Sequence, residues 1–196
     1  MTHYYSKTQT GTIERKTITA HLRGKDIILT TGSGTFSQSR VDPGPRLLIE
    51  EATFEPGARV LDLGCGTGVL GIALKATCHQ CEMVLTDVNE RAVLLAKENA
   101  ALNKLEVVTV SGDRYEKVTG LFDAIFLNPP QRAGRELCNS MVEQAPEHMK
   151  TGGYFWLVCR HQIGGKMFEK KMEEVFGNVE TIARQSGYRV YRSRKN

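Results

Sequence analysis

The chain has 196 residues, a formal net charge of +4, 40% hydrophobic residues and 24% charged residues. This length suits one α/β domain and is short for two, and the apolar content is sufficient for a full core. No stretch is as long and apolar as a membrane span, and the polar N-terminus lacks the apolar region of a signal peptide. We therefore expect a cytoplasmic protein.

The number of cysteines, five, is odd, which argues against a closed secreted disulfide framework. Cys78 and Cys81 have the spacing of half a metal site, but no second pair of this kind follows. We therefore expect free thiols or a local disulfide rather than zinc, and no metal cofactor.

Residues 1–45 have the composition of strands rather than helices. Two β-branched runs, 17–22 and 27–30, flank Arg23-Gly24-Lys25-Asp26, which has the chemistry of a hairpin turn. The glycine-rich segment 32–44 follows and contains Phe36. It is interpreted either as a linker or as a lid whose aromatic ring closes over a site. We expect residues 1–45 to form an N-terminal β extension and lid before a compact domain at 46–196.

From residue 45 onward, helical and strand-like segments alternate, as a doubly wound parallel sheet requires. Pro146 is expected to kink or end one helix early, and residues 150–153 to close it. The last two strands are expected to form the closing antiparallel pair of the sheet. The expected helices cover 45–52, 69–74, 89–100, 136–149 and 166–176, and the expected strands cover 58–63, 83–86, 107–110, 122–127, 154–159, 179–183 and 188–191.

The segment Asp62-Leu63-Gly64-Cys65-Gly66-Thr67-Gly68, here called the glycine loop, joins a buried strand to a helix. This arrangement lets the backbone approach a bound ligand where a Cβ would collide, although a tight turn between core elements is the alternative. The dinucleotide pattern needs its last glycine at position 69, which is Val69, so the spacing disfavours a nicotinamide or flavin site. The spacing G-x-G-x-G after an acidic residue instead resembles that of class I S-adenosylmethionine methyltransferases.

Acidic residues follow each of the first three strands of the expected sheet. Asp87 ends the second strand and can accept both hydroxyls of a ribose, whereas a helix N-terminal charge is the alternative. Asp113 is placed to accept from an adenine amino group, or is a turn aspartate. Asp62 would orient the loop and approach a methionyl ammonium. The expected cofactor is S-adenosylmethionine, and its expected contacts are Asp62, Gly64, Cys65, Gly66, Thr67, Gly68, Asp87, Val88 and Asp113.

Asn128-Pro129-Pro130 ends the fourth strand, beside the place where a transferable methyl would lie. Exocyclic amines are poor nucleophiles because the nitrogen lone pair is delocalised. The Asn oxygen and a following Pro carbonyl can accept hydrogen bonds from the NH₂, which favours a pyramidal nitrogen aimed at the methyl. A strand-terminating turn is the alternative. We predict that Asn128, Pro129 and Pro130 are the catalytic residues.

These motifs, together with Thr35-Phe36-Ser37, Val41-Asp42-x-Gly44 and Gly187-Tyr188-Arg189-Val190, resemble the small-subunit ribosomal RNA methyltransferase C type. The similarity covers about Lys16 to Lys195 and is greatest to the compact archaeal members that have only the catalytic domain. The resemblance implies a Rossmann-like, seven-stranded methyltransferase sheet and methylation of guanine N2 in structured RNA. Many N-P-P amine methyltransferases continue with Phe or Tyr, which stacks on the flipped base, but this chain has Gln131. Phe36 is therefore the first candidate for stacking, and Arg132 is a further expected substrate contact.

The resulting hypothesis is an RNA guanine-N2 methyltransferase that acts on ribosomal RNA or tRNA. A protein glutamine N5-methyltransferase shares Asn-Pro-Pro, but usually continues with Tyr and adds an N-terminal helical domain. DNA adenine methylation is disfavoured because no target-recognition domain fits in the length. A module that binds S-adenosylmethionine or RNA without turnover is disfavoured by the intact Asn128 and glycine loop. The basic residues from Arg184 onward suit a polyanionic partner or a solvated cationic tail.

Overall fold

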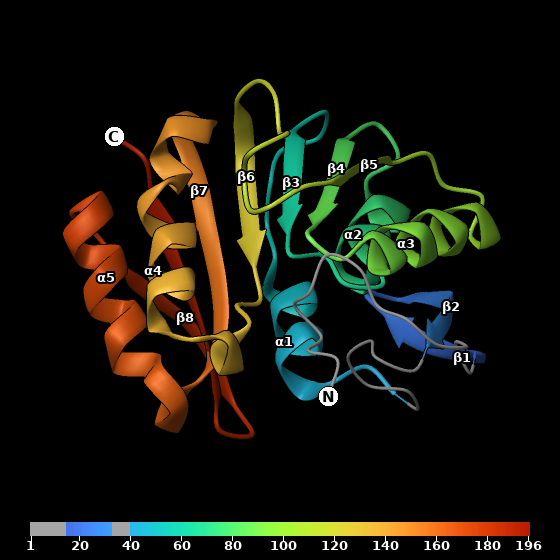
Figure 1. Ribbon diagram of the computed structural model, residues 1–196, viewed down its shortest axis with the longest axis horizontal. Helices are drawn as coiled ribbons and strands as arrows, with labels where there is room; N and C mark the ends of the chain where they lie inside the picture. The colour runs from blue at the N-terminus through green and yellow to red at the C-terminus, as the bar shows by residue number, and fades with distance from the viewer. Residues whose placement is uncertain (1–14, 33–39) are drawn as a thin grey trace.

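A computed structural model describes residues 15–32 and 40–196 (Figure 1). In this part of the chain a two-stranded sheet precedes a seven-stranded one. The strands are β1 (Arg15–Leu22), β2 (Lys25–Gly32), β3 (Arg59–Leu63), β4 (Glu82–Asp87), β5 (Val108–Ser111), β6 (Phe122–Leu127), β7 (Met149–Arg160), β8 (Glu180–Gln185) and β9 (Tyr188–Arg194). The helices are α1 (Pro43–Glu51), α2 (Val69–Thr77), α3 (Glu90–Leu102), α4 (Arg135–Glu143) and α5 (Lys166–Phe176), with short 3-10 turns η1 (Gln131–Ala133) and η2 (Ala145–His148) and an irregular turn η3 (His161–Gly165).

The large sheet has the strand order β5-β4-β3-β6-β7-β9-β8. The first five of these strands are parallel, and β9 pairs antiparallel with both β7 and β8. The chain moves outward from β3 to β5 and then returns to the other side of β3 with β6. Ligands of open α/β sheets bind at this reversal, outside the carboxyl ends of the strands. The expected seven-stranded Rossmann-like sheet, with its closing antiparallel pair and N-terminal hairpin, is confirmed.

Each face of the large sheet carries its own apolar core. Alternate residues along β3 and β6 enter different cores, since neighbouring side chains of a strand point to opposite faces. Val60 and Phe126 pack with α1, α2 and α3, whereas Leu61 and Ile125 pack with α4 and α5. Burial on both faces explains the nearly continuous apolar sequence of these strands.

The N-terminal hairpin lies beside α3, at the edge toward which the arrows of β3, β4 and β6 point (Figure 1). Its turn is formed by Arg23 and Gly24, both with positive φ (49° and 72°), as a tight hairpin turn requires. The outer edge of β2 pairs with side chains instead of another strand. The amides of Asn99 and Asn103 on α3 bond to the backbone N–H and C=O groups of Thr30 and Ile28, respectively.

The helix expected over 136–149 ends early, which confirms the expectation for Pro146, and only its first half is an α-helix. α4 ends at Glu143, Pro146 lies in the 3-10 turn η2, and β7 already begins at Met149. Residues 150–153 therefore belong to a strand and do not close a helix. Proline has no N–H to continue the helical hydrogen bonds, and Met149 pairs instead with Phe122 on β6.

Two further findings concern the expectations from composition. Cys78 and Cys81 form a disulfide at the C-terminal end of α2, which is one of the two expected states. In the described ranges, 15–32 and 40–196, no helix is long and apolar enough to cross a membrane.

Candidate cofactor and substrate site

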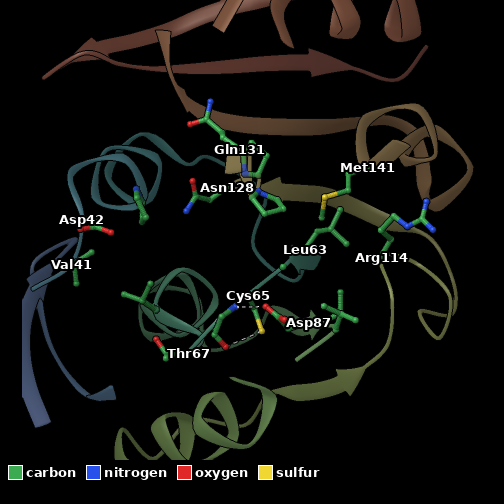
Figure 2. A pocket seen from close by; sticks show the side chains of 18 of the residues that line it. Val41, Asp42, Leu63, Cys65, Thr67, Asp87, Arg114, Asn128, Gln131 and Met141 are labelled. Carbon is green, nitrogen blue, oxygen red and sulfur yellow. Dashed lines mark hydrogen bonds between the residues drawn. The ribbon is translucent and has the colours of Figure 1, made fainter. Parts of the chain in front are cut away.

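A cavity of about 800 Å³ opens at the carboxyl ends of β3, β4, β5 and β6 (Figure 2). The glycine loop, the ends of β4 and β6, the hairpin and the start of β9 all contribute to its wall. Its lining includes Ile18, Leu29, Thr31, Arg40, Val41, Asp42, Leu63, Gly64, Cys65, Gly66, Thr67, Val69, Thr86, Asp87, Val88, Gly112, Asp113, Arg114, Asn128, Pro129, Pro130, Gln131, Leu137, Met141, Arg160, Ile163 and Tyr188. Its size is typical of a cavity for a small-molecule cofactor.

The glycine loop is held against β4 by its own backbone. The N–H groups of Gly64 and Cys65 both donate to the carbonyl oxygen of Thr86, at 2.8 and 2.9 Å. Gly64, Gly66 and Gly68 have positive φ values of 70°, 54° and 82°, which side chains with a Cβ rarely adopt. The loop therefore presents bare backbone to the cavity, and the glycines are required by the conformation itself.

Asp87 faces the cavity and fixes the loop at the same time. Its two carboxylate oxygens accept from the N–H of Gly66 at 2.9 Å and from the N–H of Asn89 at 2.8 Å. The residue is only 8% exposed, and burial raises the pKa of its carboxyl despite these hydrogen bonds. Each oxygen has a further lone pair, so a hydroxyl donor in the cavity would find an acceptor here.

Asp62 and Gly68 lie behind the cavity wall. Asp62 accepts from the N–H of Gly71 at 2.9 Å, inside the first turn of α2, and it is 3% exposed. Burial raises the pKa of this carboxyl to about 7, and the neighbouring Asp87 contributes in the same direction. Asp62 therefore orients the start of α2. The expected direct approach of Asp62 to a ligand ammonium stays a prediction.

Cys65 belongs to the wall as a neutral thiol. Burial raises its pKa well above the ordinary value, and the nearby Asp62 and Asp87 act in the same direction. The side chain is 7% exposed, and its Sγ lies 3.6 Å from the carbonyl oxygen of Gly66. A thiol held neutral in this way is a packing contact and not a nucleophile.

Asp113 lies on the cavity wall, but its carboxylate is already paired. Arg114 donates to it through Nη2 at 2.8 Å and through Nε at 3.2 Å, and also reaches Ser140 Oγ at 3.1 Å. Figure 2 shows Arg114 beside Met141 on one side of the cavity. If Asp113 accepts a hydrogen bond from an adenine amine, as predicted, it must do so with carboxylate lone pairs that Arg114 does not occupy. Sequence reasoning did not single out Arg114, since only its contacts reveal its role.

Asn128 projects into the cavity from the end of β6 (Figure 2). Among the described residues, none forms a hydrogen bond with its side-chain amide. The carbonyls of Pro129 and Pro130 each accept a backbone N–H, from Gln131 at 2.8 Å and from Ala133 at 2.7 Å. The Pro130 carbonyl also accepts from Cys138 Sγ at 3.5 Å. The Asn128 oxygen is thus the more available acceptor, and the Pro129 carbonyl can accept an amine only with its second lone pair.

Two expected substrate contacts lie outside the described residues. These are Phe36, and with it residues 33–39 of the expected lid, and the side chain of Arg132. The described part of the expected lid includes Val41 and Asp42, and both line the cavity (Figure 2).

The sequence reasoning missed several cavity residues, including Arg160, Ile163 and Tyr188. Tyr188 lies within Gly187-Tyr188-Arg189-Val190, one of the segments that resemble methyltransferase C, so the sequence did point to it. Ile163 carried no local signal, because an isolated isoleucine before two glycines has no pattern of its own.

These features match a nucleoside cofactor. Bare glycine backbone accommodates close approach, the Asp87 carboxylate can accept from hydroxyls, and the cavity has the required volume. Together with the parallel sheet and its reversal at β3, they define the class of protein, a Rossmann-like protein with a ligand site at the strand ends.

The comparisons with known proteins give the family. Residues 26–192 match the methyltransferase small domain, so the chain belongs to this family of methyltransferases. The Bacillus subtilis protein named "Uncharacterized protein YbxB" is 36% identical over 199 residues, 98% of each chain. "Ribosomal RNA small subunit methyltransferase C" of Stutzerimonas stutzeri is 34% identical over 82% of this chain, but over 48% of its own length. The chain thus spans about half the length of the methyltransferase C relatives it matches.

A solved structure is also similar. The Thermus thermophilus 16S rRNA N2 G1207 methyltransferase (RsmC), in complex with AdoMet and guanosine, has a TM-score of 0.85 at 26% identity, covering 96% of this chain and 52% of that one. The expected resemblance to methyltransferase C is confirmed, and so is the cofactor, S-adenosylmethionine. The narrower expectation of archaeal members has no support among these relatives.

Proposed function

We propose that this methyltransferase acts on an exocyclic amine in RNA, namely N2 of guanine in ribosomal RNA. The observation that carries the proposal is the position of Asn128-Pro129-Pro130, which ends β6 and lines the same cavity as the glycine loop. The names of the methyltransferase C relatives and of the Thermus structure support this substrate.

The proposed cofactor contacts are the backbone of the glycine loop, the Asp87 carboxylate for the ribose, and Val88 and Asp113 for the adenine. S-adenosylmethionine bound there would supply an electrophilic methyl group, and the acceptor nitrogen would gain this methyl and release one N–H proton to water. Asn128 has the role of holding the amine, because its side-chain oxygen accepts an N–H and directs the nitrogen lone pair into the cavity. Leu63, Val69 and Met141 supply apolar surface that limits water around the reacting groups.

RNA as the partner and the cytoplasm as the place of action belong to the same proposal. So does the division into an N-terminal extension (1–45) and a methyltransferase domain (46–196). The described N-terminal elements are strands.

The test is to incubate the purified chain with labelled S-adenosylmethionine and separate pools of unmethylated ribosomal RNA and tRNA. Digestion to nucleosides is expected to give labelled N2-methylguanosine from ribosomal RNA, and none with Asn128→Ala. Label in adenine, in protein glutamine, or in no acceptor at all would contradict the proposed substrate.

A further inference from the structure

Gln131 occupies the position at which many N-P-P amine methyltransferases have an aromatic ring. Its side chain does not extend freely into the cavity. Nε2 donates to the carbonyl oxygen of Ile163 at 2.5 Å, and Oε1 accepts from the N–H of Arg160 at 3.4 Å. Both ends of the amide thus bond to the segment that leads from β7 into α5.

That segment places an apolar side chain at the cavity without covering it. Ile163 is 58% exposed and is part of the cavity lining. Among the large apolar side chains that are exposed in ranges 15–32 and 40–196, Ile163 is the only one that lines the cavity. An exposed isoleucine at the rim of a binding cavity loses contact with water when a ligand covers it, which favours binding.

The backbone at Ile163 depends on support from outside the turn. Ile163 has φ −110° and ψ 60°, and Gly164 follows with φ 98°, so η3 is not a regular helix. The bond from Gln131 holds the Ile163 carbonyl from outside the turn, and with it the direction of the side chain.

A second part of the same rim is also fixed by side-chain contacts. The guanidinium of Arg160 lies 4.9 Å from the centre of the Tyr188 ring, and its Nε donates to the Tyr188 hydroxyl at 3.0 Å. The ring packs closely on α1, because a Cβ at Gly44 would lie 2.6 Å from one of its carbons. Gln131, Arg160, Ile163 and Tyr188 all line the cavity that contains Asn128.

We infer that Ile163, held in place by Gln131, is the apolar contact for the face of the target base whose amine binds Asn128. The inference rests on the proposed function. Ile163 takes the part of the missing aromatic residue from a different element of the fold, and Gln131 is a positioning residue that acts through it. The occupant is the guanine of the proposed function, because the flat ring that carries its N2 amine enters the same cavity when that amine binds Asn128.

The test measures single-turnover methylation of ribosomal RNA as a function of RNA concentration, with S-adenosylmethionine affinity measured separately by calorimetry. Ile163→Ala is expected to raise the RNA concentration for half-maximal rate by roughly ten-fold, from the loss of about two to three buried carbon groups. The affinity for S-adenosylmethionine and the melting temperature stay unchanged. Ile163→Phe keeps an apolar side chain at this position and is expected to raise this RNA concentration less than Ile163→Ala does. The matched control is Leu94→Ala, which removes an exposed leucine of α3 that is not part of the cavity.

Gln131→Glu removes the amide donor that faces the Ile163 carbonyl while keeping an oxygen toward Arg160. It is expected to raise the RNA concentration for half-maximal rate. The double variant with Ile163→Ala is expected to raise this concentration little beyond Ile163→Ala alone, because the two residues act as a unit. An RNA dependence in Ile163→Ala equal to that of the unchanged chain, or an equal rise in Leu94→Ala, would overturn the inference and leave the proposed function standing. No methylation of RNA by the unchanged chain would instead refute the proposed function.

Discussion

The substitution Asn99→Ala removes the side chain that joins the N-terminal hairpin to the glycine loop. Asn99 is fully buried, and its amide accepts from the N–H of Thr30 at 2.6 Å and donates to the carbonyls of Thr30 and Thr67 at 3.0 and 2.9 Å. Thr67 belongs to the glycine loop, and Thr31 and Leu29 of β2 line the cavity. One side chain therefore couples two walls of the site.

The cost follows from the number and burial of these bonds. Each hydrogen bond contributes about 1 kcal/mol net, and a buried group left without a partner costs more. Losing all three bonds at a site closed to water should lower the free energy of unfolding by about 3 kcal/mol. Because the loop carbonyl of Thr67 is released as well, affinity for S-adenosylmethionine should fall by roughly ten-fold.

Asn103→Ala is the matched control. Asn103 caps the C-terminal end of α3, four residues after Asn99, and bonds to the N–H and C=O of Ile28 at 2.9 and 2.7 Å, but on the exposed side. Water replaces these bonds, so the expected loss is about 1 kcal/mol or less, with cofactor affinity unchanged. Urea unfolding and calorimetry of both variants measure the two effects. If Asn99→Ala loses no more stability than Asn103→Ala and binds the cofactor normally, the coupling through Asn99 is refuted.

Three further substitutions test the site. Asp87→Ala should weaken S-adenosylmethionine binding by about 2 kcal/mol through the loss of a charge-assisted contact, and unchanged calorimetric affinity would exclude Asp87. Asn128→Ala should leave folding and cofactor affinity intact but remove most turnover, and a normal single-turnover rate would remove Asn128 from the mechanism. Burial holds the pKa of Asp62 at about 7, so the cofactor-free folded protein retains a proton that the unfolded chain loses near pH 4. The free energy of unfolding should therefore fall as pH rises from about 4 to 7 and then level off, and Asp62→Asn should lack this part of the fall. If urea unfolding gives the same pH dependence for the variant and the unchanged chain, the raised pKa of Asp62 is contradicted.

The elements that the sequence predicted best are those whose local and tertiary preferences agree. β6 covers residues 122–127 and α5 covers residues 166–176, as expected. In both elements the pattern of apolar residues is uninterrupted, and turn residues lie at its ends. The expected helix over 136–149 was wrong for an instructive reason. Cys138, Met141, Val142, Ala145 and Met149 keep a helical spacing, and all five are buried in one core. The chain changes from helix to strand within this series, so periodicity alone could not locate the change.

For the site, the sequence predicted residues whose identity reflects a local requirement. Glycines with positive φ and an aspartate at a strand end are visible in one sequence, because backbone geometry demands them. The structural roles of Asn99 and Gln131 could not be predicted from the sequence, since each side chain bonds to backbone groups far along the chain, at Thr30 and Ile163 respectively. A buried amide on a helix has no sequence pattern that distinguishes it from an exposed one.

This difference separates the two halves of the cavity in how they are built. In the part of the cavity wall formed by the glycine loop, backbone N–H groups bond to the β4 carbonyl of Thr86 and to Asp87, so changing this part means rebuilding the loop. In the part of the wall formed by η1 and η3, the side chain of Gln131 bonds to the backbone of the exposed Ile163. Substitutions at positions 131 and 163 leave the bonds of the glycine loop in place. Under our proposal that Ile163 contacts the target base, the choice of target can change while cofactor binding is kept, and no aromatic residue is needed after Asn-Pro-Pro.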